Sequence, residues 1–287
     1  MFKMMTTLPL PPTLSVAVPF GRGNIHIARR GHKSSILLVA ISRPRVKNAF
    51  SDDLYLDLVS VLNSVSLDDS LSAIVLTGDG SYFSSGADLK GNFMPEDDGA
   101  SRDTLNKPAG QFMMTLLSFP KLVAAAVNGP AIGIAVTLLL HCDLCFCTRQ
   151  ASFWTPFTRI ALVPEFCSTT TFVETMGMAK ANALLMLGEK IDAETALSWN
   201  LCSRVVKNCD ASGDPFHRNS VGSYLCHEID ERLLKLPRGH QTAQVFASMV
   251  RGRRKSRLQR ICREELIALD QRFDSGECLE AAMQLQI

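Results

Sequence analysis

The chain has 287 residues, of which 46% are hydrophobic and 20% are charged, and its formal net charge at pH 7 is +2. These values are typical of a globular protein with a sizeable core. The net charge argues neither for nor against a polyanionic partner, but no dense Lys/Arg stripe with interleaved aromatics is present, so no nucleic-acid partner is expected. The longest apolar run, residues 131–140, is too short to span a bilayer, so no membrane partner is expected.

The N-terminal segment differs in composition from the rest of the chain. Residues 1–22 are rich in proline and show no amphipathic period, which predicts a flexible leader. No Asp or Glu precedes Asp52, and an acid-poor start is typical of mitochondrial import. The final Leu-Gln-Ile does not resemble a peroxisomal targeting tripeptide. We expect a mitochondrial or peroxisomal matrix location and leave the organelle open.

Strands and helices alternate along the next two hundred or so residues. Two strands joined by a Gly/Lys/Ser turn are predicted in residues 23–42. Ser51 is a good N-cap for a helix, because its hydroxyl can accept from the first turn and two aspartates follow it. Further strands are predicted in residues 72–80, 121–133, 143–149, 151–165 and 202–206, and further helices in 109–120, 134–142, 168–188 and 192–201.

This alternation predicts an α/β core domain over residues 23–207, in which a parallel sheet is flanked by helices. A helical C-terminal section is predicted over residues 208–287. The polar, aperiodic residues 91–108 are predicted to form a mobile excursion. Ligands of such folds bind at the carboxyl ends of the strands, which is where the segments "SSGAD" and "NGPAIGI" are expected.

These two segments are candidates for anion binding. Gly86 permits a sharp turn and Ala87 is expected to lead into a helix, while Gly133 and Ile134 open another helix. The backbone N–H groups of Ala87 and Ile134 are therefore free to donate. Each segment alone fits a plain strand-to-helix loop, but two such donors aimed at one point form an oxyanion hole.

At this point the chain resembles the crotonase (enoyl-CoA hydratase/isomerase) superfamily. The segments "RPRVKNAF", "IVLTGDGSYFSSGADL", "FPKLVAAAVNGPAIGIAVTLLLHCDL" and "FWTPFTRIALVPEFCSTTTF" carry the resemblance, in order, from about residue 35 to 207. "PFTRIALVPEFCSTT" is similar to the peroxisomal-type Δ3,Δ2-enoyl-CoA isomerases. The resemblance implies a ββα superhelix with a C-terminal trimerisation section, an acyl-CoA thioester substrate and a homotrimer or hexamer. It implies no cofactor beyond the coenzyme A of the substrate.

The resemblance also implies which residues act. The thioester oxygen accepts from the Ala87 and Ile134 N–H groups, and Glu165 is the catalytic base. Family hydratases carry glutamates at two positions that here hold Thr137 and Phe157, so isomerisation is expected rather than hydration. Without the resemblance, Glu165 would be read as an acid in the first turn of a helix. Apolar neighbours should raise its pKa and the helix start should lower it, and which effect is larger stays open.

The remaining implied residues contact the substrate. The coenzyme A contacts are Ser84, Ser85, Gly86, Ala87, Asp88, Leu89, Gly133, Ala49, Arg45 and Lys47, with Arg43 and Lys90 as further cation candidates. The acyl pocket is expected to hold Phe157, Leu162 and Phe166, and Phe166 replaces the usual glycine, so it either narrows or blocks the pocket. Competing carboxylates are Asp88, Glu96, Asp97, Asp98, Asp143 and Glu174. Two alternatives stay open: a dienoyl-CoA isomerase or other enoyl-CoA enzyme, and a non-catalytic acyl-CoA-binding scaffold.

Nine cysteines, an odd number, favour free thiols in a reducing compartment. The cluster of His141, Cys142, Cys145 and Cys147 could suggest zinc, but no second ligand pair completes a tetrahedron. A buried strand is the favoured interpretation, and no metal is expected. The basic residues 251–260 are interpreted as the solvated face of a helix, with RNA binding as the alternative.

Overall fold

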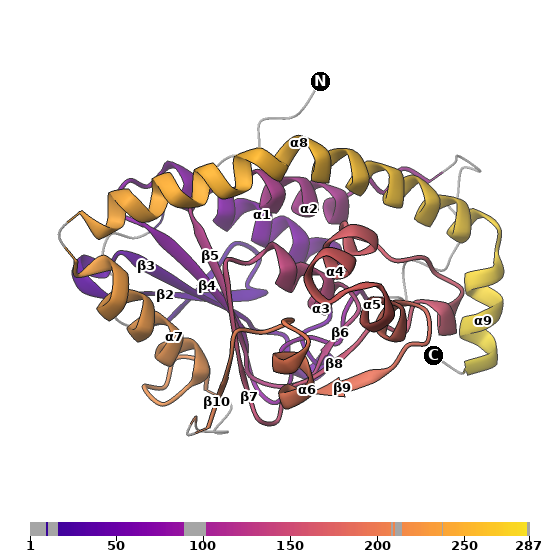
Figure 1. Cartoon of the computed structure of the whole chain (residues 1–287), viewed down its shortest axis with the longest axis horizontal. Helices are drawn as coiled ribbons and strands as arrows, with labels where there is room; N and C mark the ends of the chain where they lie inside the picture. The colour runs from indigo at the N-terminus through magenta and orange to yellow at the C-terminus, as the bar shows by residue number, and fades with distance from the viewer. Residues whose placement is uncertain are drawn as a thin grey trace.

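The computed structural model describes residue 10 and residues 17–88, 102–207, 209, 214–236 and 238–285. A seven-stranded sheet lies at its centre, with the strand order β1-β2-β3-β4-β5-β7-β10, and a smaller sheet has the order β6-β8-β9 (Figure 1). The strands are β1 (Val18–Phe20), β2 (Ile25–Arg30), β3 (Ile36–Ile41), β4 (Ala73–Gly78), β5 (Leu122–Val127), β6 (Ala131–Ile132), β7 (Leu144–Thr148), β8 (Ser152–Trp154), β9 (Lys190–Asp192) and β10 (Arg204–Val206).

The large sheet is mainly parallel, as the sequence predicts. The strands β3, β4, β5, β7 and β10 are paired parallel, whereas β1 and β2 form an antiparallel edge. Every residue of β3 and β4 is buried, which explains their uninterrupted apolar sequences. Side chains alternate between the two faces, so Leu37 and Val39 join one hydrophobic core and Leu38 joins the other.

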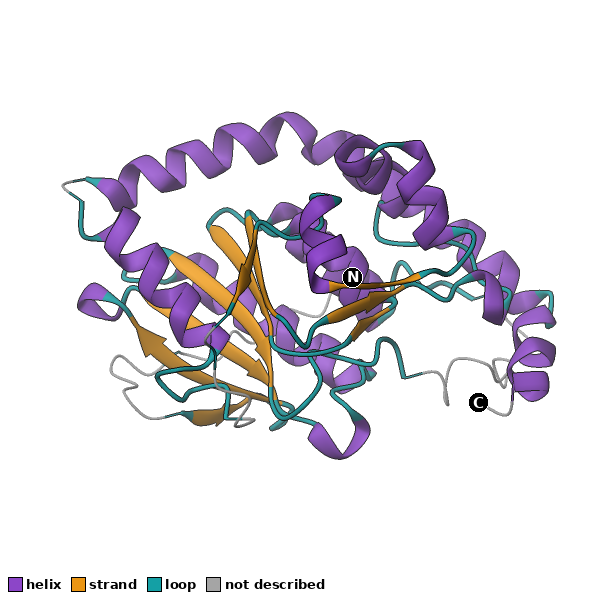
Figure 2. Cartoon of the chain, turned by 60° about the horizontal axis from the view of Figure 1, so that its bottom comes forward, coloured by secondary structure: helices purple, strands orange, loops and turns teal. Residues whose placement is uncertain are grey.

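Helices cover both faces of this sheet (Figure 2). On one face, α1 (Asp52–Leu67), α2 (Pro108–Ser118) and the long α8 (Gly239–Asp274) contribute to the larger core. On the other face, α7 (Val221–Ile229) packs against β3, β4, β5 and β7. The remaining helices are α3 (Ile134–Thr137), α4 (Ser168–Met176), α5 (Met178–Leu185), α6 (Ala193–Ser198), α9 (Glu277–Leu285), short 3-10 turns at η1 (His32–Ser34), η2 (Pro44–Val46), η3 (Leu138–His141) and η4 (Thr158–Ile160), and a π-helical turn η5 (Asp230–Leu234).

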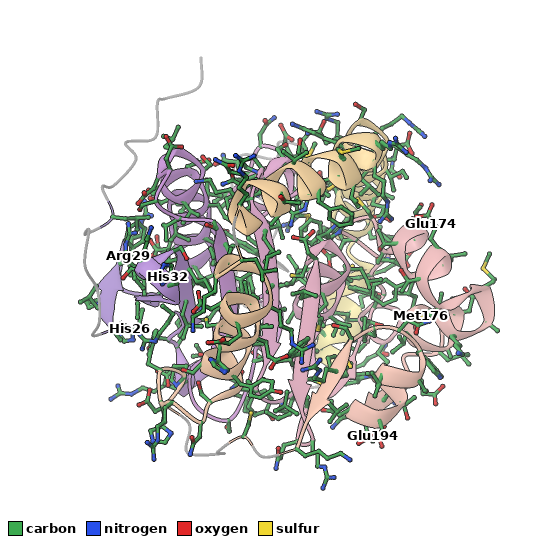
Figure 3. The ribbon with its side chains drawn as sticks, turned by 60° about the vertical axis from the view of Figure 1, so that its left-hand side comes forward. His26, Arg29, His32, Glu174, Met176 and Glu194 are labelled. Atoms are coloured by element: carbon green, nitrogen blue, oxygen red, sulfur yellow. The ribbon has the colours of Figure 1, made fainter. Side chains whose placement is uncertain are left out.

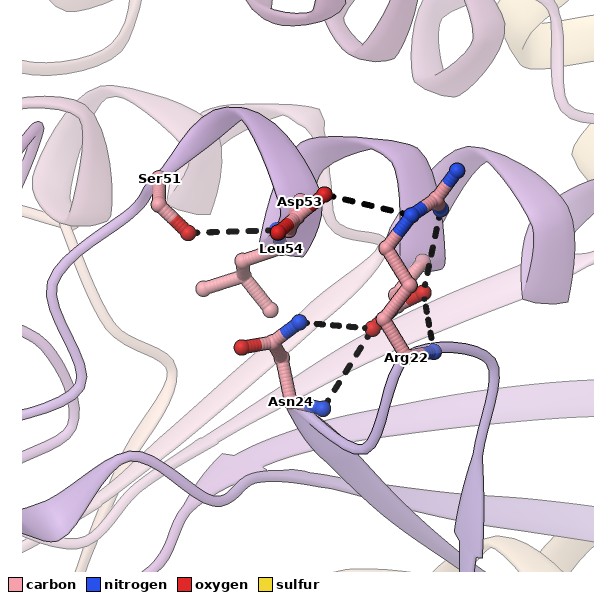
Figure 4. A network of polar contacts seen from close by, with 6 residues as sticks. Arg22, Asn24, Ser51, Asp53 and Leu54 are labelled. Atoms are coloured by element: carbon pink, nitrogen blue, oxygen red, sulfur yellow. Dashed lines mark hydrogen bonds and ion pairs between the residues drawn. The ribbon is translucent and has the colours of Figure 1, made fainter.

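The first strand begins inside the segment that was expected to be a leader. Val18 lies opposite Ile27 in the β1–β2 pair, which corrects the leader boundary expected at residue 22. The turn between these strands is fixed to α1 by the buried carboxylate of Asp57. Figure 4 shows Arg22 and Asn24 of this turn beside the first turns of α1. Asp57 accepts from the Arg22 N–H at 2.8 Å and from the Asn24 side-chain amide at 2.9 Å. The residues that make these polar contacts follow no strand or helix periodicity. The sequence therefore placed the end of the leader a few residues too late.

The C-terminal section is helical as predicted and belongs to the same folded unit as the core. Leu225 of α7 and Leu266 of α8 are fully buried, each in a different hydrophobic core. The basic run lies on a mostly exposed side of α8. There, Arg254 and Arg257 form ion pairs with Glu174 at 2.8 and 2.6 Å, and Glu174 lies at the molecular surface on α4 (Figure 3).

Candidate active site

Two loops at the carboxyl ends of β4 and β5 lie side by side. The backbone of Ser84 forms a parallel bridge with Ala131, and the Ile132 N–H donates to the Ser84 carbonyl at 3.1 Å. The first loop continues to Ala87 and the second to Ile134. Direct pairing of the two loops therefore fixes the position of each predicted N–H donor relative to the other.

Gly86 allows the close approach of these loops. Its φ is +88°, and a Cβ at this position would lie 2.7 Å from the Ile132 carbonyl oxygen, so an L side chain does not fit. Among the described residues, no acceptor bonds the N–H groups of Ala87 or Ile134. Ile134 is the first residue of α3, where a helix leaves its N–H groups without partners. Both residues line the same cavity.

This cavity has a volume of about 140 Å³ and mostly apolar walls. Its walls come from α1, α2, the two paired loops, the segment around η4 and the C-terminal half of α8. Apolar lining is provided by Ala109, Met113, Ile132, Pro156, Phe157, Ile160, Leu162, Leu269 and Phe273. The other lining residues are Asp52, Tyr55, Ser85, Gly86, Ala87, Arg102, Thr104, Lys107, Gly133, Ile134 and Glu165. An apolar pocket with a few polar groups is the usual form of a small-molecule site.

Glu165 is the buried carboxylate among the described lining residues, with 6% of its surface exposed. The Thr137 hydroxyl donates to Glu165 Oε1 at 2.8 Å, whereas Oε2 has no partner among the residues that the structure describes. Burial raises the pKa of Glu165 to about 8, the Thr137 hydrogen bond acts in the opposite direction, and the charge of Glu265 adds to the rise. Burial therefore has the largest effect on the pKa of Glu165, and the direction of the shift, which the sequence left open, is upward.

Phe166 points away from the cavity, which corrects its expected place in the acyl pocket. Its side chain is fully buried, with its ring centre 4.3 Å from that of His141 and 6.0 Å from that of Phe112. Phe166 and Cys167 both have a positive φ, 58° and 62°, and this turn directs Glu165 to the cavity and Phe166 into the core. Phe166 therefore neither narrows nor blocks the cavity.

The competing carboxylates that the structure describes have other partners or positions. Asp88 lies 3.9 Å from Arg43, and Asp143 forms an ion pair with Arg251. Glu174 is bound by arginines of α8, and Asp52 lines the cavity but is exposed. Glu96, Asp97 and Asp98 lie outside the described residues.

The cation candidates lie beside the first loop. Arg45 and Lys47 are exposed and do not line the cavity. Their loop is bonded to the donor loop, because the Ser85 N–H donates to the Lys47 carbonyl at 2.9 Å. Ser85, Gly86, Gly133, Phe157 and Leu162 line the cavity, whereas Ala49 and Ser84 are buried and do not line it. Leu89 and Lys90 lie outside the described residues.

The cluster of His141 and three cysteines is only partly in a strand, because His141 ends η3 and Cys142 follows it. Cys145 and Cys147 are buried in β7, and all nine cysteines are free thiols. Cys147 Sγ lies 3.5 Å from Sγ of Cys202, which precedes β10, so these two thiols are in contact. Within the described ranges, no group of three or more His, Cys, Asp or Glu side chains gathers as metal ligands do.

Comparison with known proteins assigns the chain to a family. The sequence profile described as enoyl-CoA hydratase/isomerase matches residues 31–217. The chain belongs to the enoyl-CoA hydratase/isomerase family. This family member is 35% identical over 217 residues to the Mus musculus protein named enoyl-CoA delta isomerase 3, peroxisomal, and the match covers 75% of the chain and 68% of the mouse protein.

Other relatives agree with this assignment. The family member is 34% identical over 254 residues to enoyl-CoA delta isomerase 2 of Rattus norvegicus, over 88% of its own length and 61% of the rat protein. The chain thus spans about three fifths of that relative. The solved structure of Pseudomonas aeruginosa OdaA superimposes with a TM-score of 0.79 at 30% identity, covering 91% of the chain and 98% of OdaA. The fold is therefore the crotonase fold that the sequence predicted.

Three side chains around Glu165 were not found from the sequence of this family member. Tyr55 lines the cavity, and burial, followed by the charge of Glu165, raises its pKa well above the ordinary value. At position 137 the sequence indicated only that a hydratase glutamate is absent, and it did not indicate that the Thr137 hydroxyl donates to Glu165. Glu265 comes from α8, far along the chain. No spacing rule connects these positions, because tertiary packing brings them together.

Proposed function

We propose that the protein is an intramolecular isomerase that moves the double bond of a 3-enoyl-CoA to the trans-2 position, a step in the β-oxidation of unsaturated fatty acids. One observation carries the proposal: the buried Oε2 of Glu165 has no partner among the described residues, and it shares a cavity with two unbonded backbone N–H groups. The names of the rat and mouse relatives support it.

In the proposed reaction, the two N–H groups stabilise negative charge on the thioester oxygen. Glu165 removes a proton from C2, and the electron pair moves to the carbonyl oxygen as an enolate. The Ala87 and Ile134 N–H groups donate to this oxygen, and each such donor contributes about 3–4 kcal/mol to the stability of the transition state. The protonated Glu165 then returns its proton to C4 as the C2–C3 double bond forms. A pKa of about 8 makes Glu165 a strong base that is still partly ionised near neutral pH.

The same site is poorly suited to hydration. Adding water to a 2-enoyl-CoA requires one group to activate the water and another to deliver a proton. The positions that hold glutamates in hydratases of this family carry Thr137 and Phe157 here. Thr137 is bonded to Glu165, and Phe157 is part of the apolar lining. A single carboxylate that takes and returns one proton is sufficient for isomerisation.

The test is conversion of 3-enoyl-CoA to 2-enoyl-CoA by the purified protein. Glu165→Gln should lower kcat by roughly a thousandfold or more, because the amide cannot accept the proton while its shape fills the same space. Glu264→Gln is a matched control, since Glu264 is exposed on α8 and pairs only with Arg260 among the described residues. A normal kcat for Glu165→Gln, with the control also normal, would show that another group is the base.

Two rival activities are tested with the same protein. Faster turnover of a 3,5-dienoyl-CoA would favour a dienoyl-CoA isomerase, and robust hydration of a 2-enoyl-CoA would contradict the roles given to Thr137 and Phe157. The non-catalytic scaffold was suggested by Phe166, and that support is lost because Phe166 lies in the core. Tight binding of acyl-CoA without turnover of any enoyl-CoA would restore it.

We also propose a matrix location, in mitochondria or peroxisomes, and assembly as a homotrimer or hexamer. The mouse relative, which is named as peroxisomal, supports an organellar location. No helix within the described residues is long and apolar enough to cross a membrane. Large apolar side chains that are exposed on α8, namely Val245, Phe246 and Met249, support burial against other subunits. Light scattering of the full chain tests the assembly. Coenzyme A enters only as part of the substrate, and Arg45 and Lys47 are proposed to attract its phosphates.

A further inference from the structure

The long C-terminal helix reaches the segment that carries Glu165. Glu265 of α8 is buried, with 7% of its surface exposed. Its Oε2 accepts from the Cys167 N–H, and its Oε1 accepts from the Thr169 N–H at 3.1 Å and from the Thr169 hydroxyl. Both oxygens of one carboxylate are thus bonded to residues two and four positions after Glu165.

The segment that Glu265 binds has an unfavourable backbone. Phe166 and Cys167 are consecutive non-glycine residues with φ of 58° and 62°, a region in which an L side chain is strained. Cys167 is also the N-cap residue of α4, and its side chain accepts no capping hydrogen bond. The Glu265 carboxylate, which comes from another part of the chain, accepts hydrogen bonds from the backbone N–H groups at the start of α4. These bonds offset the strain of the left-handed turn and replace the absent N-cap hydrogen bond.

We propose that Glu265 is a positioning residue for the isomerisation: it holds the left-handed turn at Phe166–Cys167 and thereby aims Glu165 Oε2 into the cavity. This inference rests on the proposed function. Two further contacts from α8 act on the same segment, since Cys167 Sγ donates to the Leu258 carbonyl at 3.1 Å and Arg272 Nε donates to the Ala161 carbonyl at 2.9 Å.

Glu265 also acts on Glu165 through charge. The groups that interact with Glu165 among the described elements are Thr137 of α3, Tyr55 of α1, and Cys262 and Glu265 of α8. Of these, Glu265 is the carboxylate, and its charge raises the pKa of Glu165. Removing that charge should therefore lower the pH at which Glu165 ionises. A residue that only stabilised the fold would leave this pH unchanged.

The experiment compares Glu265→Gln with the wild type in the 3-enoyl-CoA assay across pH. The amide nitrogen of glutamine cannot accept, so one of the two bonded backbone N–H groups loses its partner. We expect kcat on the high-pH plateau to fall by roughly tenfold to a hundredfold, as small misplacements of a catalytic group do. We expect KM to change little and the midpoint of the pH profile to move to lower pH. Glu189→Gln, at an exposed position with no side-chain partner among the described residues, should change none of these.

Thr169→Val provides a second variant in case Glu265→Gln does not fold. Thr169 is exposed, and valine deletes only the hydroxyl that donates to Glu265, so a smaller fall of kcat at constant KM is expected. A folded Glu265→Gln or Thr169→Val protein with wild-type kcat and pH midpoint would overturn the proposal. If Glu165→Gln is inactive in the same assay, the proposed function survives that result. If Glu165→Gln keeps full activity, the proposed function itself is wrong.

Discussion

Replacing Glu165 by glutamine should stabilise the protein while it removes the proposed activity. In the unfolded chain this carboxyl ionises near 4.5, and in the fold burial keeps it protonated up to about pH 8. Between these values the folded state binds more protons than the unfolded state, so stability falls as pH rises. Each pH unit in this window costs about 1.4 kcal/mol of unfolding free energy, which gives an upper bound of about 5 kcal/mol at high pH. Glutamine, which stays neutral and can keep the Thr137 hydrogen bond, removes this cost.

Urea unfolding of both proteins, followed by far-UV circular dichroism at several pH values, measures the effect. The difference in unfolding free energy should be near zero at pH 4.5 and should grow in favour of Glu165→Gln up to about pH 8. Glu265, whose pKa is about 7, titrates in both proteins, so its own contribution cancels in the difference and only its repulsion of Glu165 remains, which belongs to the cost of ionising Glu165.

Parallel stability curves for the two proteins from pH 4.5 to 9 would refute the reasoning. That result would mean that water or a local rearrangement solvates Glu165 at little cost, and the buried, unpartnered Oε2 would then not describe its ionised state.

The remaining predictions concern activity and packing. The value of kcat/KM should rise with pH to a midpoint near 8, because Glu165 acts as a base only when ionised, and rates from pH 6 to 9.5 test this. Thr137→Val should move that midpoint upward, since the Thr137 hydrogen bond lowers the pKa, and an unchanged midpoint would contradict this role. Gly86→Ala should lower kcat by roughly a hundredfold or more, because its Cβ would separate the donor loops, whereas near-normal kcat would show that they adjust. Asp57→Ala should lower the unfolding free energy by about 2–4 kcal/mol, measured by urea titration, because it leaves the turn N–H groups unpaired.

The order of the elements could be predicted from the sequence because it depends on local signals. Alternation of residue types predicted β3, a continuous apolar run predicted β4, and the Ser51 cap predicted the start of α1, where the Ser51 hydroxyl accepts from the Leu54 N–H at 3.4 Å. The resemblance to a known family assigned Glu165 and the two N–H donors, and the structure places all three around one cavity.

The orientation of side chains near the base could not be predicted, because it depends on backbone conformation and distant packing. Phe166 follows Glu165 directly, and the sequence alone placed both in the same pocket. A left-handed turn separates them, and such a turn has no signal where neither residue is glycine. Glu265 was missed for a related reason. An acidic residue in a helix rich in charges is predicted to be exposed, and only the tertiary structure shows that residues 167–169 pack over it.

The contribution of α8 to the cavity has a consequence for biosynthesis. Leu269 and Phe273 form part of the wall, and Glu265 holds the segment of the base, yet all three leave the ribosome about one hundred residues after Glu165, several seconds later at typical rates of synthesis. A nascent chain therefore contains Glu165 and both N–H donors well before α8 can complete the cavity wall. Under the proposed function, truncation before α8 would therefore leave a protein that carries the sequence motif but lacks one wall of the cavity and the contacts of Glu265.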